Sequence, residues 1–99
     1  MHKRTKKTAI PVKVKWTVWE RDNHCCILCG RRGDPVCHYI PRSQGGLGIE
    51  TNIVTLCPEC HQEMDNGKNG EIRRRIVEAY LREYYPDWTK EAQIYKKGM

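Results

Sequence analysis

The sequence contains no phenylalanine, and only 38% of its 99 residues are hydrophobic, so the apolar core that it can build is small. It also lacks a run of 18 apolar residues, which excludes a membrane-spanning helix. The basic segment 1–16 has no apolar stretch of the kind that a secretory signal needs. We therefore expect a cytoplasmic protein whose cysteine thiols are reduced rather than paired in disulfides.

Positive charge and cysteine are both plentiful. Eighteen Lys and Arg against twelve Asp and Glu give a net charge of +6, which suits a polyanionic partner such as DNA but is shared by many other proteins. A chain of this length forms one domain at most. Six cysteines in a chain with so few apolar residues indicate a bound metal, because a thin core needs additional stabilisation.

Composition divides the chain into three parts. Residues 1–10 are too polar to pack and are predicted to form a flexible basic arm, residues 11–86 a folded domain, and residues 87–99 a polar tail that packs only through Trp88 and Ile94. Between residues 11 and 22 a helix is favoured over a strand, because Trp19 breaks the alternation of apolar residues. Both Trp16 and Trp19 are assigned to the core.

Two short strands and a helix are expected in the rest of the domain. The apolar runs at residues 36–40 and 53–56 predict strands on either side of the Gly-rich loop 41–48. From residue 70 to residue 85 the period becomes helical, and Pro86 ends the helix. Its predicted apolar face consists of Ile72, Ile76, Val77, Tyr80, Leu81 and Tyr84.

Two C-x-x-C pairs, Cys26–Cys29 and Cys57–Cys60, predict a structural zinc site. Two residues between cysteines let both sulfurs of a tight turn reach one ion, and two such turns complete a tetrahedron of four sulfurs. Gly30 follows the first pair and suits a turn that needs a positive φ. Two unrelated redox pairs are the less favoured interpretation. Cys25 cannot join the same tetrahedron and is interpreted as a packed thiol.

The segment between the two cysteine pairs contains a motif rich in chemistry. It reads C-H-Y-I-P-R-S-Q-G-G at residues 37–46 and N-I-V-T-L-C-P-E-C-H at residues 52–61. This pattern resembles the HNH endonucleases of the ββα-metal type, in their zinc-containing form found in phages and mobile elements. Among these it is most similar to small phage nucleases encoded near terminase genes. The resemblance covers roughly residues 11–67 and implies a small α+β fold, with a ββα-metal motif and a four-cysteine zinc site flanked by helices.

The resemblance also implies a role for individual residues. His38 takes the place of the general base, Asn52 the place of the residue that fixes the Gly-rich loop or orients the base or the metal, and His61 that of a ligand to the catalytic divalent ion. The family usually has Asp or His before the base, where this chain has Cys37. A thiolate ligand would favour Mn²⁺, Ni²⁺ or Zn²⁺ over Mg²⁺. Asp65, four residues after His61 on one helix face, is the alternative ligand.

The predicted function of residues 11–86 is that of a metal-dependent DNA endonuclease of low sequence specificity, using Mg²⁺, Mn²⁺ or Ni²⁺. An imidazole with a near-neutral pKa suits proton abstraction from water, and a divalent ion stabilises the charge that develops. Arg42, Arg73, Arg74 and Arg75 are candidates for phosphate contacts, although a solvated helix face is the favoured interpretation of the last three. The resemblance implies products with 5′-phosphate and 3′-hydroxyl ends, and processing of phage DNA with a terminase as a partner. A non-catalytic zinc module that docks on DNA or on a packaging machine is the alternative, and a redox switch at Cys25 or Cys37 is a weaker one.

Overall fold

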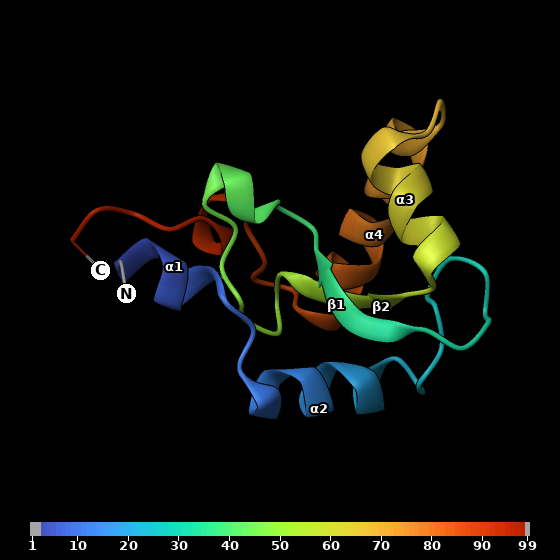
Figure 1. The fold of residues 1–99 in the computed structure, drawn as a ribbon, viewed down its shortest axis with the longest axis horizontal. Helices are drawn as coiled ribbons and strands as arrows, with labels where there is room; N and C mark the ends of the chain where they lie inside the picture. Colours follow the sequence, from blue (N-terminus) through green and yellow to red (C-terminus); the bar gives the residue numbers. More distant parts are fainter. Residues whose placement is uncertain (1–2, 99) are drawn as a thin grey trace.

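The computed structural model describes residues 3–98, except for the side chain of Lys3 (Figure 1). It is a small α+β fold in which a two-stranded sheet lies among four helices. The strands are β1 (Asp34–His38) and β2 (Ile53–Leu56). The helices are α1 (Lys3–Thr8), α2 (Val12–Arg21), α3 (Pro58–Asn66) and α4 (Gly70–Tyr84), and short 3-10 turns cover Arg42–Gln44 and Glu91–Gln93. Within residues 3–98 no helix is long and apolar enough to cross a membrane.

The two strands pair in antiparallel fashion, with Cys37 opposite Val54 and His38 opposite Ile53. The predicted second strand has the observed bounds, whereas the first begins at Asp34 and ends at His38, two residues earlier at each end than expected. The reason lies in Asn52, whose side-chain oxygen accepts a hydrogen bond from the Ile40 backbone N–H at 2.9 Å. The Tyr39 N–H still bonds to the Asn52 backbone carbonyl at 2.8 Å, but at Ile40 the Asn52 side chain replaces the strand partner.

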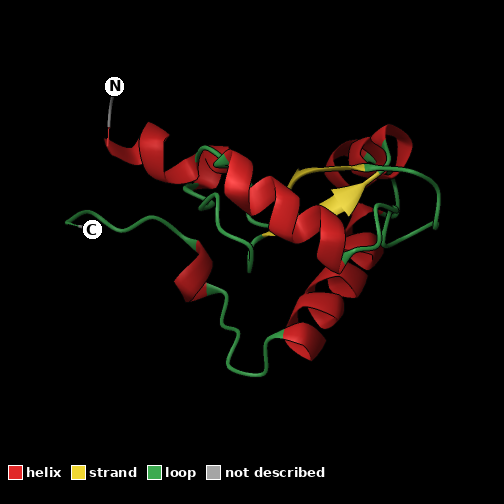
Figure 2. Ribbon diagram, turned by 90° about the horizontal axis from the view of Figure 1, so that it is seen from below, coloured by secondary structure: helices red, strands yellow, loops and turns green. Residues whose placement is uncertain are grey.

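Helices cover both faces of the sheet. Helix α2 lies against one face, and α3 and α4 lie on the other, as Figure 1 and the view from below in Figure 2 show. From α2, Val18 is fully buried, while Met64 of α3 and Val77 and Leu81 of α4 join a core that includes Cys37 and both ends of β2. The sheet is therefore a thin layer between helices, and its two ends carry the chemistry of the motif.

Helix α4 has the predicted bounds to within one residue, but only part of its predicted face is buried. Val77 and Leu81 are buried and Tyr80 packs against the core, as expected. The prediction is wrong for Ile72, Ile76 and Tyr84, which are 58%, 49% and 49% exposed. A sheet of only two strands is too narrow to cover a wide apolar face, so the outer part of the α4 stripe stays in solvent.

Helix α2 confirms the helical interpretation of residues 11–22, but the assignment of both tryptophans to the core is wrong. Trp16 is 57% exposed, and Trp19 is half-buried, with its ring stacked on that of His24 at 3.7 Å. Val18 occupies the position that faces the sheet. Trp16 is two residues away, which on a helix of 3.6 residues per turn is roughly 200° around the axis.

The structure places residues 3–10 differently from the flexible arm that the sequence predicted. Helix α1 packs its last turn onto the domain, where Thr8 is 2% exposed and the Lys7 carbonyl accepts a hydrogen bond from the Gly48 N–H at 3.0 Å. Arg4 donates to the Ser43 carbonyl at 2.9 Å. Met1 and His2 lie outside the described residues. These partners are far away in sequence, which explains why composition alone favoured an arm.

The C-terminal tail follows the expectation more closely. Trp88 is buried and its indole N–H donates to the Thr51 carbonyl at 2.6 Å, while Ile94 packs partly against the core. Gln93, which the sequence did not single out, is also buried and bonds to Thr51 and Thr89. Met99 lies outside the described residues. The domain boundaries after residues 10 and 86 stay a prediction.

Candidate active site and zinc site

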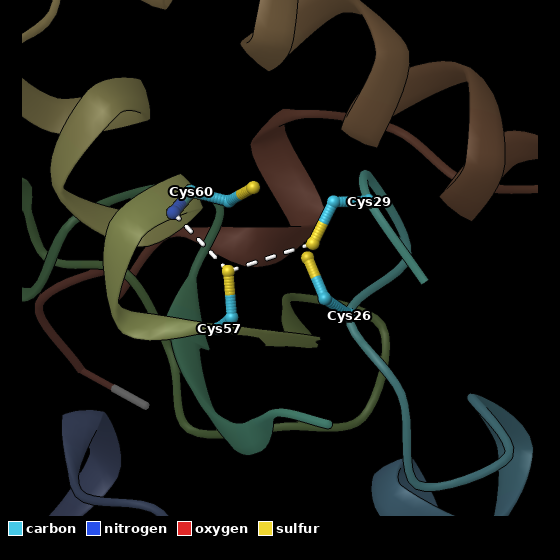
Figure 3. A group of neighbouring side chains, drawn as sticks. All are labelled: Cys26, Cys29, Cys57 and Cys60. Atoms are coloured by element: carbon cyan, nitrogen blue, oxygen red, sulfur yellow. Dashed lines mark hydrogen bonds between the residues drawn. The ribbon is translucent and has the colours of Figure 1, made fainter. Parts of the chain in front are cut away.

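The four cysteines of the two C-x-x-C pairs meet at one point. Their sulfurs all lie within 4.8 Å of one another, and Figure 3 shows them converging from two turns of the chain. The Sγ atoms of Cys29 and Cys57 are 3.6 Å apart. With a Zn–S distance of about 2.3 Å, sulfurs at the corners of a tetrahedron lie about 3.8 Å apart. The cysteine cluster therefore fits a four-coordinate structural zinc ion.

Local backbone features hold each pair in place. After the first pair, Gly30 adopts φ +80°, and its N–H donates to the Cys26 carbonyl at 2.9 Å, which closes the turn. In the second pair, Cys57 is the N-cap of α3, and its sulfur accepts a hydrogen bond from the Cys60 N–H (Figure 3). Pro58 occupies the first turn of that helix, a position where its missing N–H has no effect.

The close packing of the four cysteines shifts the pKa values of two of their thiols in opposite directions. Burial and the neighbouring cysteines raise the pKa of Cys60 above its usual value. At Cys26 burial also opposes ionisation, but backbone N–H groups of Cys57, Cys29 and Leu28 outweigh it and lower the pKa to about 7. Four clustered thiolates repel one another, so a bound cation would relieve the charge.

His38 is the last residue of β1, and its orientation is set by helix α1. Its Nε2 lies 2.7 Å from the Thr8 carbonyl oxygen. Because a carbonyl can only accept, Nε2 carries the hydrogen, and Nδ1 of the neutral ring is left with its lone pair. Burial lowers the pKa of His38, the nearby Arg42 guanidinium and the His61 ring act in the same direction, and the bond to Thr8 opposes them. His38 is therefore neutral at physiological pH.

His61 and Asp65 lie on consecutive turns of α3, where their side chains form a pair. Nε2 of His61 is 3.4 Å from Oδ2 of Asp65, and the two side chains are 36% and 42% exposed. One nitrogen and one carboxylate oxygen thus lie together at the surface, with room for water and substrate. Among residues 3–98 the four zinc-site cysteines are the only group of three or more metal-ligating side chains. A divalent ion at His61 and Asp65 would therefore keep several ligands from water or phosphate.

Cys37 has a different environment from the pair on α3. It has no exposed surface and belongs to the core, and its sulfur lies 3.8 Å from the His38 carbonyl oxygen. Burial, together with the negative charge of Asp65, raises the pKa of the Cys37 thiol to about 12. Cys37 is therefore a packed core thiol, set apart by its burial from the exposed pair on α3.

Asn52 braces the loop that follows His38. Its side chain is fully buried and makes three hydrogen bonds: it accepts from the Ile40 N–H and donates to the carbonyls of Ile40 and Leu47 at 3.2 and 2.8 Å. Gly46 lies directly against Ile40, since an added Cβ would sit 1.6 Å from the Ile40 carbonyl oxygen. Of the roles that the family resemblance left open for Asn52, the structure supports fixing of the Gly-rich loop.

The predicted phosphate-binding arginines differ in their exposure and in the partners that their side chains contact. Arg42 is exposed near His38, and it donates to the hydroxyl of Thr8 and the carbonyl of Thr5. Arg74 is half-buried: it donates to the Tyr39 carbonyl and stacks over the Tyr39 ring, 5.0 Å from its centroid. Arg73 lies 4.0 Å from Glu63. Asp65, Arg74 and Arg75 line one open groove of about 960 Å³ between the loop after β1 and helices α3 and α4.

Comparison with known proteins agrees with this arrangement. The family model described as HNH endonuclease matches residues 26–67, which run from the first zinc-site cysteine to the end of α3. Residues 26–67 of this chain are an HNH endonuclease family domain. The chain is 35% identical over 68 residues to the type IV methyl-directed restriction enzyme EcoKMcrA of Escherichia coli (strain K12); the match covers 59% of this chain and 24% of the enzyme. It is 31% identical over 58 residues to anaredoxin of Nostoc sp. (strain PCC 7120), covering 57% of this chain and 76% of that protein. No solved structure is significantly similar.

The residues that match the HNH family model do not include every residue of the candidate active site. The chain spans about a quarter of the length of the restriction enzyme that it matches. The matched residues 26–67 include His38, Asn52 and the α3 pair, but not Thr8, whose carbonyl orients His38. Sequence reasoning missed Thr8, because a backbone carbonyl carries no residue-type signal and its partner is 30 residues away.

Proposed function

We propose that this protein is a metal-dependent DNA endonuclease that hydrolyses phosphodiester bonds with His38 as the general base. The observation that carries the proposal is the state of His38 within an HNH module. One ring nitrogen is occupied by the Thr8 carbonyl, and the pKa is lowered, so the other nitrogen is ready to accept a proton. Nδ1 would take the proton from the attacking water, while the bond at Nε2 keeps the ring in one orientation.

The residues of α3 would hold the catalytic ion. His61 and Asp65 offer one nitrogen and one oxygen at the surface, which fits Mg²⁺ or Mn²⁺ with further ligands from water and phosphate, and Ni²⁺ through its affinity for imidazole. When bound, such an ion stabilises the charge that develops on the phosphate and on the departing 3′-oxygen. We place Cys37 outside this set, because its side chain has no exposed surface and packs in the core, whereas His61 and Asp65 lie at the surface.

DNA is the substrate that the charge and the family support. The net charge of +6 favours a polyanion, and the exposed Arg42 next to His38 is suited to a phosphate contact. A lone ββα unit of this size engages one strand, so we expect nicking with little sequence preference and products with 5′-phosphate and 3′-hydroxyl ends. Processing or packaging of phage DNA, with a terminase as partner and in the host cytoplasm, stays a prediction that rests on the resemblance of the motif.

A supercoiled-plasmid assay on zinc-loaded protein tests the proposal. We expect nicking by the wild type in Mg²⁺, Mn²⁺ or Ni²⁺ and none without a divalent ion. His38→Ala should lose about 100-fold to 10,000-fold in rate, since general-base catalysis contributes that much. Folding of each variant is checked by its zinc content and its circular dichroism spectrum. A folded wild type that binds DNA but does not cleave it in any of the three ions would establish the alternative, a non-catalytic docking module.

A second set of variants in the same assay identifies the metal ligands. Asp65→Asn removes the charge that would bind the ion and should abolish nicking, whereas Cys37→Ala should leave the rate and the ion preference unchanged. Glu63→Gln is the matched control, because it removes a carboxylate from the same helix at a position that faces Arg73. Loss of activity or a switch of ion preference in Cys37→Ala, with Asp65→Asn active, would assign the ligand role to the thiolate instead.

A further inference from the structure

A small recess next to His38 contains two positive charges from different parts of the chain. The recess has a volume of about 270 Å³ and is lined by Ile10, Lys15, Val36, His38 and Arg42. Lys15 comes from α2, which the family model does not cover, and Arg42 comes from the 3-10 turn after β1. No carboxylate lines the recess.

Neither positive charge is neutralised by an ion pair within the described part of the chain. Arg42 donates only to the neutral oxygens of Thr8 and Thr5. Lys15 is half-buried on α2, and its ammonium has no carboxylate within 4.0 Å among residues 3–98. Two like charges that line one recess repel each other, and an anion bound between them would be attracted to both.

We infer that this recess binds a backbone phosphate of the DNA beside the general base, with Lys15 and Arg42 as its two ligands. Arg42 presents a planar fork of donors and Lys15 a compact point charge, a pairing suited to two oxygens of one phosphate. The recess, at about 270 Å³, is large enough to admit a phosphate group. The apolar side chains of Ile10 and Val36 reduce the water around both charges, which strengthens each contact. This inference rests on the proposed function, and it adds α2 to the nucleic-acid interface.

The chain offers a matched control for Lys15. Lys13 lies two residues earlier on the same helix, is exposed, and does not line the recess. Lys13→Ala and Lys15→Ala remove the same charge from the same helix, and alanine favours helix at both positions. Any difference between the two variants therefore reports the recess rather than the net charge of the protein.

The first experiment measures binding of a short duplex, without divalent ions, at several salt concentrations. The slope of log K against log salt is negative, and loss of one phosphate contact decreases its magnitude by about 0.9. We expect this decrease for Lys15→Ala, a much smaller one for Lys13→Ala, and recovery of the slope in Lys15→Arg. Equal slopes for Lys13→Ala and Lys15→Ala would overturn the inference.

The second experiment measures single-turnover nicking of plasmid at saturating protein, where weaker binding no longer limits the rate. Lys15→Ala should be slower than Lys13→Ala by about tenfold or more, because a phosphate held beside the base contributes to orientation and charge stabilisation. Equal rates in the two variants would overturn the placement beside His38 and leave the proposed nuclease function intact. A wild type that never nicks, but whose binding depends on Lys15 and not Lys13, would overturn the nuclease function and support the phosphate site.

Discussion

At the residue scale, His38 and Asn52 have different roles at the loop after β1. The side-chain amide of Asn52 bonds through both its oxygen and its nitrogen to the backbone of residues 40 and 47. It therefore fixes the loop and does not face solvent. His38 keeps one nitrogen uncommitted. Its environment favours the neutral ring through burial and through the nearby Arg42 guanidinium and His61 ring. Asn52, which fixes the loop, is thus distinct from His38, the proposed general base.

The lowered pKa of His38 predicts the pH dependence of nicking. In the proposed mechanism the neutral ring is the base, so activity should fall when pH drops below the pKa of His38. Because that pKa is lowered, we expect this acid limb below about pH 6.5. Arg42→Ala removes a positive charge that disfavours protonation. The pKa should then rise, and the acid limb of kcat/KM should move to higher pH, whatever happens to the maximal rate. An acid limb that stays in place in Arg42→Ala would contradict this assignment.

Replacing Asn52 should cost stability rather than chemistry alone. Asn52→Ala leaves three backbone groups near Ile40 and Leu47 without their partners in the core. Each unsatisfied buried group costs about 1 to 3 kcal/mol, so we expect a loss of at least about 3 kcal/mol in the free energy of unfolding. Urea denaturation measures it. Gln44→Ala, an exposed change in the same loop, is the control and should stay within about 0.5 kcal/mol of wild type.

At the element scale, helix α1 and the Gly-rich loop lock each other in place. The Gly48 N–H donates to the Lys7 carbonyl, Arg4 donates to the Ser43 carbonyl, and the next residue along, Thr8, presents its own carbonyl to His38. The second half of the loop is therefore a docking point for α1. A segment that composition describes as a basic arm thus sets the orientation of His38, the proposed general base.

Gly48→Ala tests this coupling. An added Cβ would lie 1.9 Å from the Ala9 carbonyl oxygen, a backbone atom that cannot swing away, so residues 8–10 must shift. We expect a loss of about 1 to 3 kcal/mol in the free energy of unfolding, as for other overpacked sites. Nicking should also slow, because the Thr8 carbonyl moves from Nε2 of His38. Gln44→Ala, an exposed change in the same loop, is the control. Nicking at the wild-type rate in Gly48→Ala would show that α1 does not position His38.

At the scale of the whole molecule, the cysteine cluster connects the turn after α2 to the start of α3. The core is thin: it relies on a two-stranded sheet with a few side chains from α2, α3 and α4. A structural zinc ion contributes on the order of 10 kcal/mol of folding free energy, which exceeds the net stability of many small domains. Cys57 is both a member of the cluster and the N-cap of α3, the helix that carries His61.

Removal of zinc should therefore unfold the protein. A strong chelator is expected to abolish the cooperative thermal transition followed by circular dichroism, and added Zn²⁺ should restore it. Cys57→Ser should behave like the chelated wild type, because it removes one of four ligands. Cys25→Ser is the control, since Cys25 lies outside the cluster, and should keep one zinc per chain. An unchanged transition after verified zinc loss would refute the structural role.

Sequence alone determined the parts of this protein that depend on short-range patterns. The spacing of two C-x-x-C pairs placed the zinc site, the apolar runs located β2 and α4, and the loop motif predicted the HNH family, because each pattern lies within a few consecutive residues. Tertiary structure decided the rest. The bond from His38 to Thr8, the exposure of Trp16 and the meeting of Lys15 with Arg42 join residues that no local period relates. Such contacts arise only when helices pack on a sheet too narrow to cover them, and that geometry is a property of the folded chain.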